Sequence, residues 1–232
     1  MFIEGKGLVK KYGKGEATVY ALDHTDFGME KGEVVVILGP SGSGKSTLLN
    51  ILGGLDKVTE GSMIVDGVNL EKMSARELEA YRRNKLGFVF QSYNLTPDLT
   101  VRENIEMTAE LVNDPLSVDT LMESLGLTKY EKHFPKELSG GQQQRCAIAR
   151  AMVKKPDILI CDELTGALDT KSSKDVLKRI QSMNDTYKTT VVIITHNLNI
   201  ADMADRIIKI IDGKVVTNTK NADKKRVEEM EL

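Results

Sequence analysis

Short apolar runs recur along this chain and alternate with longer segments in which apolar residues follow a helical period. The runs at 34–38, 158–161 and 191–194 are rich in valine and isoleucine, which is typical of strands buried on both faces of a sheet. Between the last two runs, one helix face carries Val176, Leu177, Ile180 and Met183. Strands that alternate with helices predict an α/β domain with a parallel sheet.

The segment before the first of these runs follows a different pattern. Residues 2–36 contain short apolar stretches interrupted by glycines, which predicts small antiparallel strands. The pairs Asp66-Gly67 and Asp212-Gly213 predict two further hairpins, at 63–68 and at 207–216. We therefore expect an N-terminal antiparallel β layer beside the α/β core.

The pattern becomes helical from residue 92 to residue 155, which predicts an inserted α-helical subdomain. A first capping box, from Ser74 to Glu77, opens a helix to about residue 84, before this insert. A second, at Thr100, opens a helix whose apolar face carries Val101, Ile105, Leu111 and Val112. A later helix, after Ser139, places Ala147, Ile148, Ala151 and Met152 on one side.

These patterns divide the chain into parts. We expect one domain over 1–217, with its core at 1–91 and 156–217 and the helical insert at 92–155. Residues 218–232 are polar and charged, so we expect a solvated tail or a frayed helix there.

Composition narrows the possible partners. The net charge of −2 on 232 residues gives no general attraction to nucleic acid or to anionic lipid. No apolar run is long enough to cross a bilayer, and the N-terminus lacks an apolar signal segment. We therefore expect a cytoplasmic chain that does not insert into lipid, so that any membrane role needs a partner protein. The two cysteines, Cys146 and Cys161, have no metal or redox spacing and are expected in the core.

The strongest chemical signal follows the apolar run 34–38. The spacing G-x-x-x-x-G-K-[ST] is that of a phosphate-binding loop, in which glycines let backbone N–H groups face phosphate oxygens. Lys45 is expected to reach the β- and γ-phosphates, and the Ser46 hydroxyl to ligate Mg²⁺. A plain Gly/Ser turn is the alternative, but the position between a strand and a helix favours the phosphate loop. The nine residues are Gly39, Pro40, Ser41, Gly42, Ser43, Gly44, Lys45, Ser46 and Thr47.

Polar residues follow three other predicted strands. They are Gln91, the pair Asp162 and Glu163, and His196. Ligands bind at the carboxyl ends of parallel strands, so these side chains are expected to gather around one phosphate chain. Asp162 suits a Mg²⁺ ligand, Glu163 suits a group that accepts a proton from water, and His196 suits a γ-phosphate contact. Gln91 could contact the metal or the water. The alternative for Asp162 and Glu163 is helix capping, which the nearby phosphate loop disfavours.

Two further features bear on the nucleotide. Tyr12 precedes a flexible loop and could stack on adenine, although Tyr20 is a rival. The segment Ser139, Gly140, Gly141 and Gln142 starts a helix and forms a second anion site. One nucleotide already has its phosphates in the first loop, so the second site suggests a head-to-tail dimer with ATP between two copies.

Together these stretches resemble the ATP-binding subunit of an ABC transporter over nearly the whole chain. The loop at 39–47 resembles Walker A, 158–163 Walker B, 138–142 the signature motif, and 167–169 the D-loop. Gln91, His196 and Tyr12 match the Q-loop, the switch histidine and the A-loop aromatic residue. The resemblance implies a P-loop NTPase (RecA-like) core, the ABC ATPase fold, with ATP and Mg²⁺ as cofactors. It also implies a nucleotide role for Asp169.

The stretches 52–56, 87–91 and 165–169 further resemble lipoprotein-releasing, macrolide-exporting and antimicrobial-peptide-resistance systems. Two positions depart from the family pattern. Leu164 replaces the usual proline, and Asn197 replaces a frequent aspartate.

The resemblance implies an ATPase that dimerises around ATP and moves a membrane permease. We expect a homodimer, because one chain holds every part, and pairing with a different ATPase chain is the alternative. The chain would then lie on the cytoplasmic face of the membrane. Three other functions remain open at this point: a cell-division-type signalling module, a soluble ABC ATPase and a nucleotide kinase. The second usually has tandem cassettes or a coiled coil, which this chain lacks, and the third has no evident use for the signature segment.

Overall fold

The computed structural model describes residues 1–231, and its strands form two sheets. The larger sheet has six strands in the order β10-β9-β3-β8-β7-β6; the five from β9 to β6 run parallel to one another, and β10 pairs with β9 in the antiparallel direction. Its strands are β3 (Val34–Leu38), β6 (Leu86–Val89), β7 (Ile158–Asp162), β8 (Thr190–Thr195), β9 (Arg206–Ile211) and β10 (Lys214–Lys220). Phe90 was expected to end the β6 strand but lies just beyond it.

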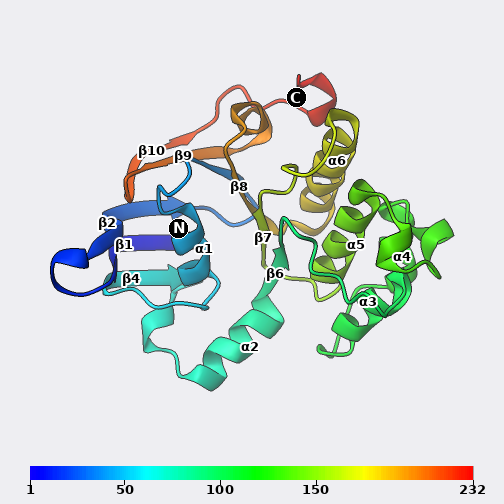
Figure 1. Cartoon of the computed structure of the whole chain (residues 1–232), viewed down its shortest axis with the longest axis horizontal. Coiled ribbons are helices and arrows are strands. Elements are labelled where there is room, and N and C mark those ends of the chain that lie inside the picture. The colour runs from blue at the N-terminus through cyan, green and yellow to red at the C-terminus, as the bar shows by residue number, and fades with distance from the viewer. Residues whose placement is uncertain (232) are drawn as a thin grey trace.

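The smaller sheet confirms the expected antiparallel layer. It has four strands in the order β2-β1-β4-β5 and lies beside α1 (Figure 1). Its strands are β1 (Ile3–Tyr12), β2 (Val19–Met29), β4 (Glu60–Val65) and β5 (Val68–Asn69). The β4–β5 hairpin turns at Asp66 and Gly67, both with positive φ, as the Asp-Gly pair predicted.

The helices cover both faces of the larger sheet. They are α1 (Lys45–Leu52), α2 (Ala75–Lys85), α3 (Val101–Ala109), α4 (Val118–Ser124), α5 (Gly140–Met152) and α6 (Thr170–Tyr187). Figure 1 shows α3, α4 and α5 together on the side away from the four-stranded sheet. Both predicted capping boxes are present, at Ser74–Glu77 and at Thr100–Glu103.

One predicted helix is shorter than expected. The helix that starts at Val101 ends at Ala109, so Leu111 does not belong to its buried face and is 57% exposed. The apolar period predicted a longer helix, but the chain leaves the helix and turns before Asn113-Asp114-Pro115.

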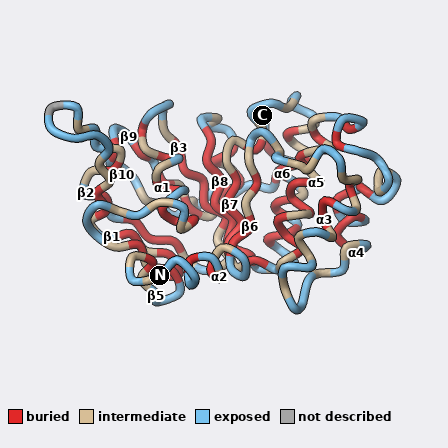
Figure 2. Tube along the Cα trace, turned by 60° about the horizontal axis from the view of Figure 1, so that its bottom comes forward, coloured by how far each residue is buried: buried red, intermediate tan, exposed pale blue. Residues whose placement is uncertain are grey.

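Alternate side chains of the central strands separate two hydrophobic clusters. Val34 and Val36 belong to the cluster that contains α5 and α6, whereas Val35 and Ile37 belong to the cluster with α1 and the smaller sheet. Strands buried on both faces explain the continuous apolar runs in the sequence, and Figure 2 shows the central strands buried along their length. Cys146 and Cys161 are free and buried, as predicted.

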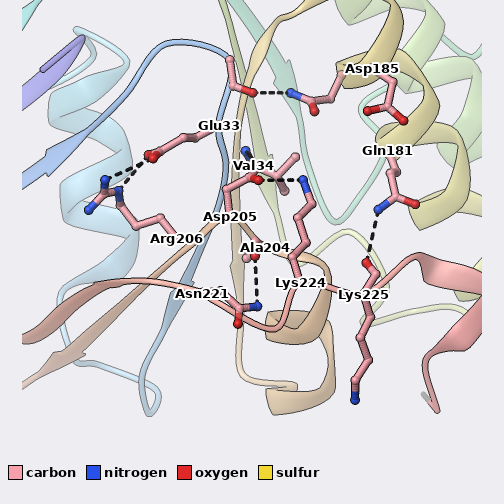
Figure 3. A network of polar contacts seen from close by, with 12 residues as sticks. Glu33, Val34, Gln181, Asp185, Ala204, Asp205, Arg206, Asn221, Lys224 and Lys225 are labelled. Carbon is pink, nitrogen blue, oxygen red and sulfur yellow. Dashed lines mark hydrogen bonds and ion pairs between the residues drawn. The ribbon is translucent and has the colours of Figure 1, made fainter.

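The C-terminal segment differs from the solvated tail that the sequence suggested. Residues up to Lys220 belong to β10, and the 3₁₀ helix η6 (Val227–Glu229) packs on the protein, with Val227 and Met230 buried. Figure 3 shows the polar part of this attachment, in which the Asn221 amide donates to the Ala204 carbonyl at 3.0 Å and Lys224 pairs with Asp205 at 2.8 Å. The many charged residues of this segment suggested exposure to solvent, although Val227 and Met230 pack into the core.

Candidate functional site

The phosphate loop connects β3 to α1, and its glycines are required by close packing. Gly44 is the N-cap of α1 with φ of 101°, and a Cβ there would collide with the Ala21 carbonyl oxygen. A Cβ on Gly39 would collide with the Ile210 carbonyl oxygen. Gly42 also has a positive φ, of 78°, but open space around it. The loop therefore needs glycine both for backbone conformation and for its approach to β2 and β9.

Lys45 lies inside the curve of this loop. Its side chain is 8% exposed, and Nζ donates to the carbonyl oxygens of Gly39 at 2.8 Å and Pro40 at 2.7 Å. Burial lowers the pKa of Lys45, and the negative charges of Glu163 and Asp162 oppose that shift. The ammonium group is thus close enough to both carboxylates for their charges to act on it.

The loop offers unused polar groups to an anion. The N–H groups of Gly42 and Gly44 take part in none of the hydrogen bonds found within residues 1–231, and the buried Ser43 hydroxyl has no partner there either. The first turn of α1 adds its free N–H groups. These donors, together with Lys45, fit the oxygen atoms of a phosphate chain.

Asp162 is the last residue of β7 and Glu163 follows it, at the carboxyl end of the parallel sheet. Burial raises the pKa of Asp162, the nearby Glu163 charge raises it further, and Lys45 opposes the shift. Glu163 has a positive φ of 50°, and its N–H donates to the Ile194 carbonyl of β8 at 3.0 Å. This bond fixes the glutamate beside the neighbouring strand, so a non-glycine residue is held in the left-handed region.

The structure places His196 against Glu163. Nδ1 of His196 lies 3.0 Å from Oε1 of Glu163, and the imidazole is largely exposed. The sequence predicted that both residues follow strands of the same sheet, and β7 and β8 are indeed neighbours. An exposed imidazole beside a carboxylate can orient a water molecule or a phosphate oxygen.

Gln91 reaches the same region from the end of β6. A Cβ built on Gly166 would lie 3.1 Å from Nε2 of Gln91 and 3.6 Å from Oε2 of Glu163. Gly166 therefore leaves room where these two side chains approach each other. Sequence reasoning assigned this glycine no function, although it lies within the stretch 165–169 that carries the family resemblance.

The residues expected to hold Mg²⁺ supply hard oxygen ligands. Ser46 is exposed at the start of α1, Asp162 carries a carboxylate, and Gln91 carries an amide oxygen. Within residues 1–231, no group of three or more His, Cys, Asp or Glu side chains could enclose a metal ion. The donor set fits a cation that completes its coordination with water and substrate phosphates, which is how Mg²⁺ is usually bound.

Tyr12 lies at the end of β1, and 44% of its surface is exposed. Its hydroxyl donates to Oδ2 of Asp56 at 2.7 Å. Burial and Asp56 raise the pKa of this phenol, whereas the Thr47 side chain lowers it, which places Tyr12 beside the end of the phosphate loop. The rival Tyr20 is about equally exposed, and its ring also lies near an ammonium group, that of Lys11 at 5.1 Å. The position beside Thr47 is what favours Tyr12.

The segment at Ser139 caps α5. The Ser139 N–H donates to Oε1 of Gln142 at 2.7 Å, and the Gln142 N–H donates to the Ser139 hydroxyl at 3.4 Å. Gly140 and Gly141 also have a packing reason that the sequence did not show. A Cβ on Gly140 would lie 2.9 Å from the Tyr93 hydroxyl, and one on Gly141 would lie 3.2 Å from Cβ of Ser172.

Asp169 is the N-cap of α6, so its carboxylate bonds to residues of the first turn of that helix. Its carboxylate accepts from the Ser172 N–H at 2.9 Å and from the Ser172 hydroxyl at 2.7 Å. These bonds lower the pKa of Asp169. The Ser139 and Asp169 segments are brought together, since Gly141 packs on the same Ser172.

A strained pair after Gln91 was not anticipated. Tyr93 and Asn94 have φ of 60° and 50°. The Arg150 guanidinium of α5 donates to both of their carbonyl oxygens, at 3.0 Å and 2.5 Å. This contact ties the segment after Gln91 to the helix that starts at Ser139.

Among the described residues, no helix is both long and apolar enough to cross a bilayer.

Comparison with known proteins identifies the family of this chain. The family described as ABC transporter matches residues 22–166. A Mycoplasma genitalium protein named as an ABC transporter ATP-binding protein is 45% identical over 231 residues, which cover 98% of this chain and 50% of the relative. The macrolide export ATP-binding/permease protein MacB of Neisseria meningitidis is 44% identical over 94% of this chain and 34% of its own length.

A solved structure resembles the fold closely. It is a dimeric, post-hydrolysis state of an ATP-binding cassette bound to ADP and Pi, with a TM-score of 0.84 and 40% sequence identity over 94% of this chain and 98% of that one. The chain spans half the length of the Mycoplasma relative and about a third of MacB.

The expected α/β fold is confirmed, and the chain belongs to the ABC transporter family as an ATP-binding, ATP-hydrolysing cassette.

Proposed function

We propose that two copies of this chain enclose ATP between the phosphate loop of one and the Ser139 segment of the other, and that hydrolysis lets them separate. The observation that carries the proposal is the convergence of Lys45, Asp162 and Glu163. Both carboxylate charges oppose the lowering of the Lys45 pKa, although Lys45 begins α1 and the carboxylates lie at the end of β7. Such a convergence of one cation and two carboxylates suits a phosphate chain with its cation and an attacking water.

The residues have separate roles. Lys45 exchanges the carbonyl oxygens of Gly39 and Pro40 for oxygens of the β- and γ-phosphates, and the loop N–H groups bind the same chain. Glu163 accepts a proton from the water that attacks the γ-phosphorus, and the leaving group is ADP. His196 and Gln91 orient that water and the γ-phosphate. Ser46, Gln91 and Asp162 would hold Mg²⁺, which neutralises phosphate charge when bound.

The second copy supplies the other half of the site. Its Ser139, Gly140, Gly141 and Gln142 would bind the γ-phosphate, and its Asp169 would line the contact. The dimeric cassette with ADP and Pi supports this arrangement. A homodimer is proposed because one chain contains every part.

We further propose that the dimer acts on an integral membrane permease, from the cytoplasmic face of the membrane. The relative MacB is named as a macrolide export ATP-binding/permease protein, which supports an export or resistance role. A cell-division-type signalling module is the alternative function, since it would use the same ATP site. The membrane protein that copurifies with this chain would distinguish the two.

Complementation between two inactive variants tests the shared site. Lys45→Ala removes the phosphate contact, and Ser139→Arg places a bulky side chain where the second copy binds. Each variant alone is expected to lose ATPase activity. In a mixed dimer, one site combines the intact Lys45 of one copy with the intact Ser139 of the other, so mixing should restore activity. Failure of the mixture to hydrolyse ATP, with both variants folded, would contradict a site shared between copies.

A further inference from the structure

Asp56 connects the Tyr12 ring to the helix that begins at the phosphate loop. The N–H of Asp56 donates to the Asn50 carbonyl of α1 at 3.1 Å, so the aspartate is attached to the C-terminal turn of that helix. Its Oδ2 accepts from the Tyr12 hydroxyl at 2.7 Å. Tyr12 and Asp56 are 44 positions apart and belong to different parts of the fold.

The Asp56 carboxylate is held in place from both of its oxygens. Oδ1 accepts from the Lys10 ammonium at 2.5 Å and from the Lys57 N–H at 2.7 Å, which leaves Oδ2 for Tyr12. Lys10 is also bonded to the Lys57 carbonyl at 2.7 Å. Hydrogen bonds to an ionised carboxylate are stronger than neutral ones, so Asp56 is a firm anchor.

The Lys10 ammonium, which is bonded to Asp56, also lies over one face of the Tyr12 ring. The Lys10 ammonium lies 5.0 Å from the centre of the Tyr12 ring. An ammonium group over a ring face is attracted by the electrons of that face and restricts rotation of the ring. The hydroxyl is fixed by Asp56 and one face is approached by Lys10, so the ring presents a preset surface to solvent.

We propose that Asp56 is a positioning residue for adenine: with Lys10 it fixes the Tyr12 ring in the orientation in which the base stacks. This inference rests on the proposed ATP site, with Tyr12 as the stacking residue. The phosphate loop then lies at the N-terminal end of α1, and Tyr12 is attached through Asp56 to its C-terminal end. The spacing between the base and the phosphate sites is set by one rigid element.

A double-mutant cycle in ATP binding tests the proposal. The proteins are wild type, Tyr12→Phe, Asp56→Ala and the double variant, and the ligands are ATP and inorganic triphosphate, both without hydrolysis in EDTA. Tyr12→Phe and Asp56→Ala are each expected to weaken ATP binding by roughly threefold to tenfold, the effect of a lost hydrogen bond. The double variant should bind ATP no more weakly than Asp56→Ala alone, because Asp56→Ala already removes the contact that Tyr12→Phe removes.

The affinity for inorganic triphosphate distinguishes a loss of Tyr12 positioning from a distortion of the phosphate loop. Triphosphate has no base, so its affinity should be unchanged in all four proteins. Equal weakening of ATP and triphosphate binding by Asp56→Ala would overturn the proposal, because it would indicate a distorted phosphate loop. Unchanged ATP binding in Asp56→Ala, or additive losses in the double variant, would overturn it too. Asp56→Asn, which keeps a hydrogen-bonding group facing the Tyr12 hydroxyl, should restore most of the affinity.

Two controls distinguish this inference from the proposed function. Glu60→Ala breaks the 2.8 Å pair with Lys11 on the same sheet without touching Tyr12, and it should leave ATP binding unchanged. Since the chain has no tryptophan, Tyr12→Trp introduces a single tryptophan at the stacking position, and ATP should quench its fluorescence. Quenching together with unaltered binding in Asp56→Ala refutes only the role of Asp56. Absence of quenching, together with triphosphate binding that depends on Lys45, refutes stacking at position 12 and leaves the phosphate site standing.

Discussion

Nδ1 of His196 lies 3.0 Å from Oε1 of Glu163, although the two residues are 33 positions apart. The contact forms because β7 and β8 are adjacent parallel strands, and each residue follows the end of its strand. Glu163 is also bonded through its N–H to the Ile194 carbonyl of β8. The carboxylate and the imidazole are therefore positioned by the sheet itself, next to the phosphate loop.

Replacement of Glu163 by glutamine tests its role as the proton acceptor. Glu163→Gln keeps the size of the side chain but cannot take a proton from water, so we expect hydrolysis to fall by about 10²- to 10⁴-fold. ATP binding should remain, and the variant should accumulate as an ATP-bound dimer. Sizing chromatography with ATP measures this, and a variant that stays monomeric with ATP bound would contradict the prediction. Glu123→Gln, on an exposed carboxylate of α4, serves as the control.

Asp162 should make function and stability respond in opposite directions. Its pKa is raised in the folded chain by burial and by Glu163, so the folded state holds this proton more tightly than the unfolded state does. As pH rises above the usual aspartate pKa and through the folded one, the charged form destabilises the nucleotide-free protein. Asp162→Asn should therefore raise the melting temperature near pH 7 and lose at least about 10²-fold in ATPase activity.

Thermal unfolding without nucleotide, at pH 7 and at lower pH, tests the stability half of this prediction. The gain from Asp162→Asn should shrink as the pH falls toward the ordinary aspartate pKa, where the wild-type side chain is neutral. A melting temperature that falls equally at both pH values would show that Asp162 stabilises the fold.

Two glycines of the phosphate loop should differ in their tolerance of alanine. Gly44→Ala adds a Cβ that collides with the Ala21 carbonyl at φ of 101°, so a loss of about 2–4 kcal/mol of unfolding free energy is expected. Gly42→Ala has a positive φ but open space, so about 1 kcal/mol is expected. Denaturant unfolding measures both. Equal losses would mean that the contact with Ala21 does not limit the loop.

The C-terminal segment should contribute to stability although the sequence suggested a solvated tail. Met230 is buried in the core cluster that contains α5 and α6, so Met230→Ala should cost about 2–4 kcal/mol. Glu231→Ala, at an exposed neighbouring position, should change stability by less than about 0.5 kcal/mol. Denaturant unfolding of both variants is the measurement. A neutral Met230→Ala would support the solvated tail.

Local rules gave the elements and the candidate chemistry of this chain. Apolar runs predicted the strands, capping boxes predicted the starts of α2 and α3, and Asp-Gly pairs predicted both hairpins, because these signals act over a few residues. The spacing of the phosphate loop and the polar residues after three strands predicted which side chains would meet. Local signals misjudged the end of α3 and the C-terminal segment, where packing by distant residues decides.

The sequence by itself determined that a glycine-rich loop, an Asp-Glu pair and a histidine each follow a strand, because strand and loop signals are written in neighbouring residues. Only the tertiary structure decided what lies against them. The anchoring of Tyr12 by Asp56, the hold of Arg150 on the carbonyls of Tyr93 and Asn94, and the collision that forbids a side chain at Gly44 all join residues far apart in the chain. Such contacts depend on strand order and helix placement, which no short stretch of sequence encodes.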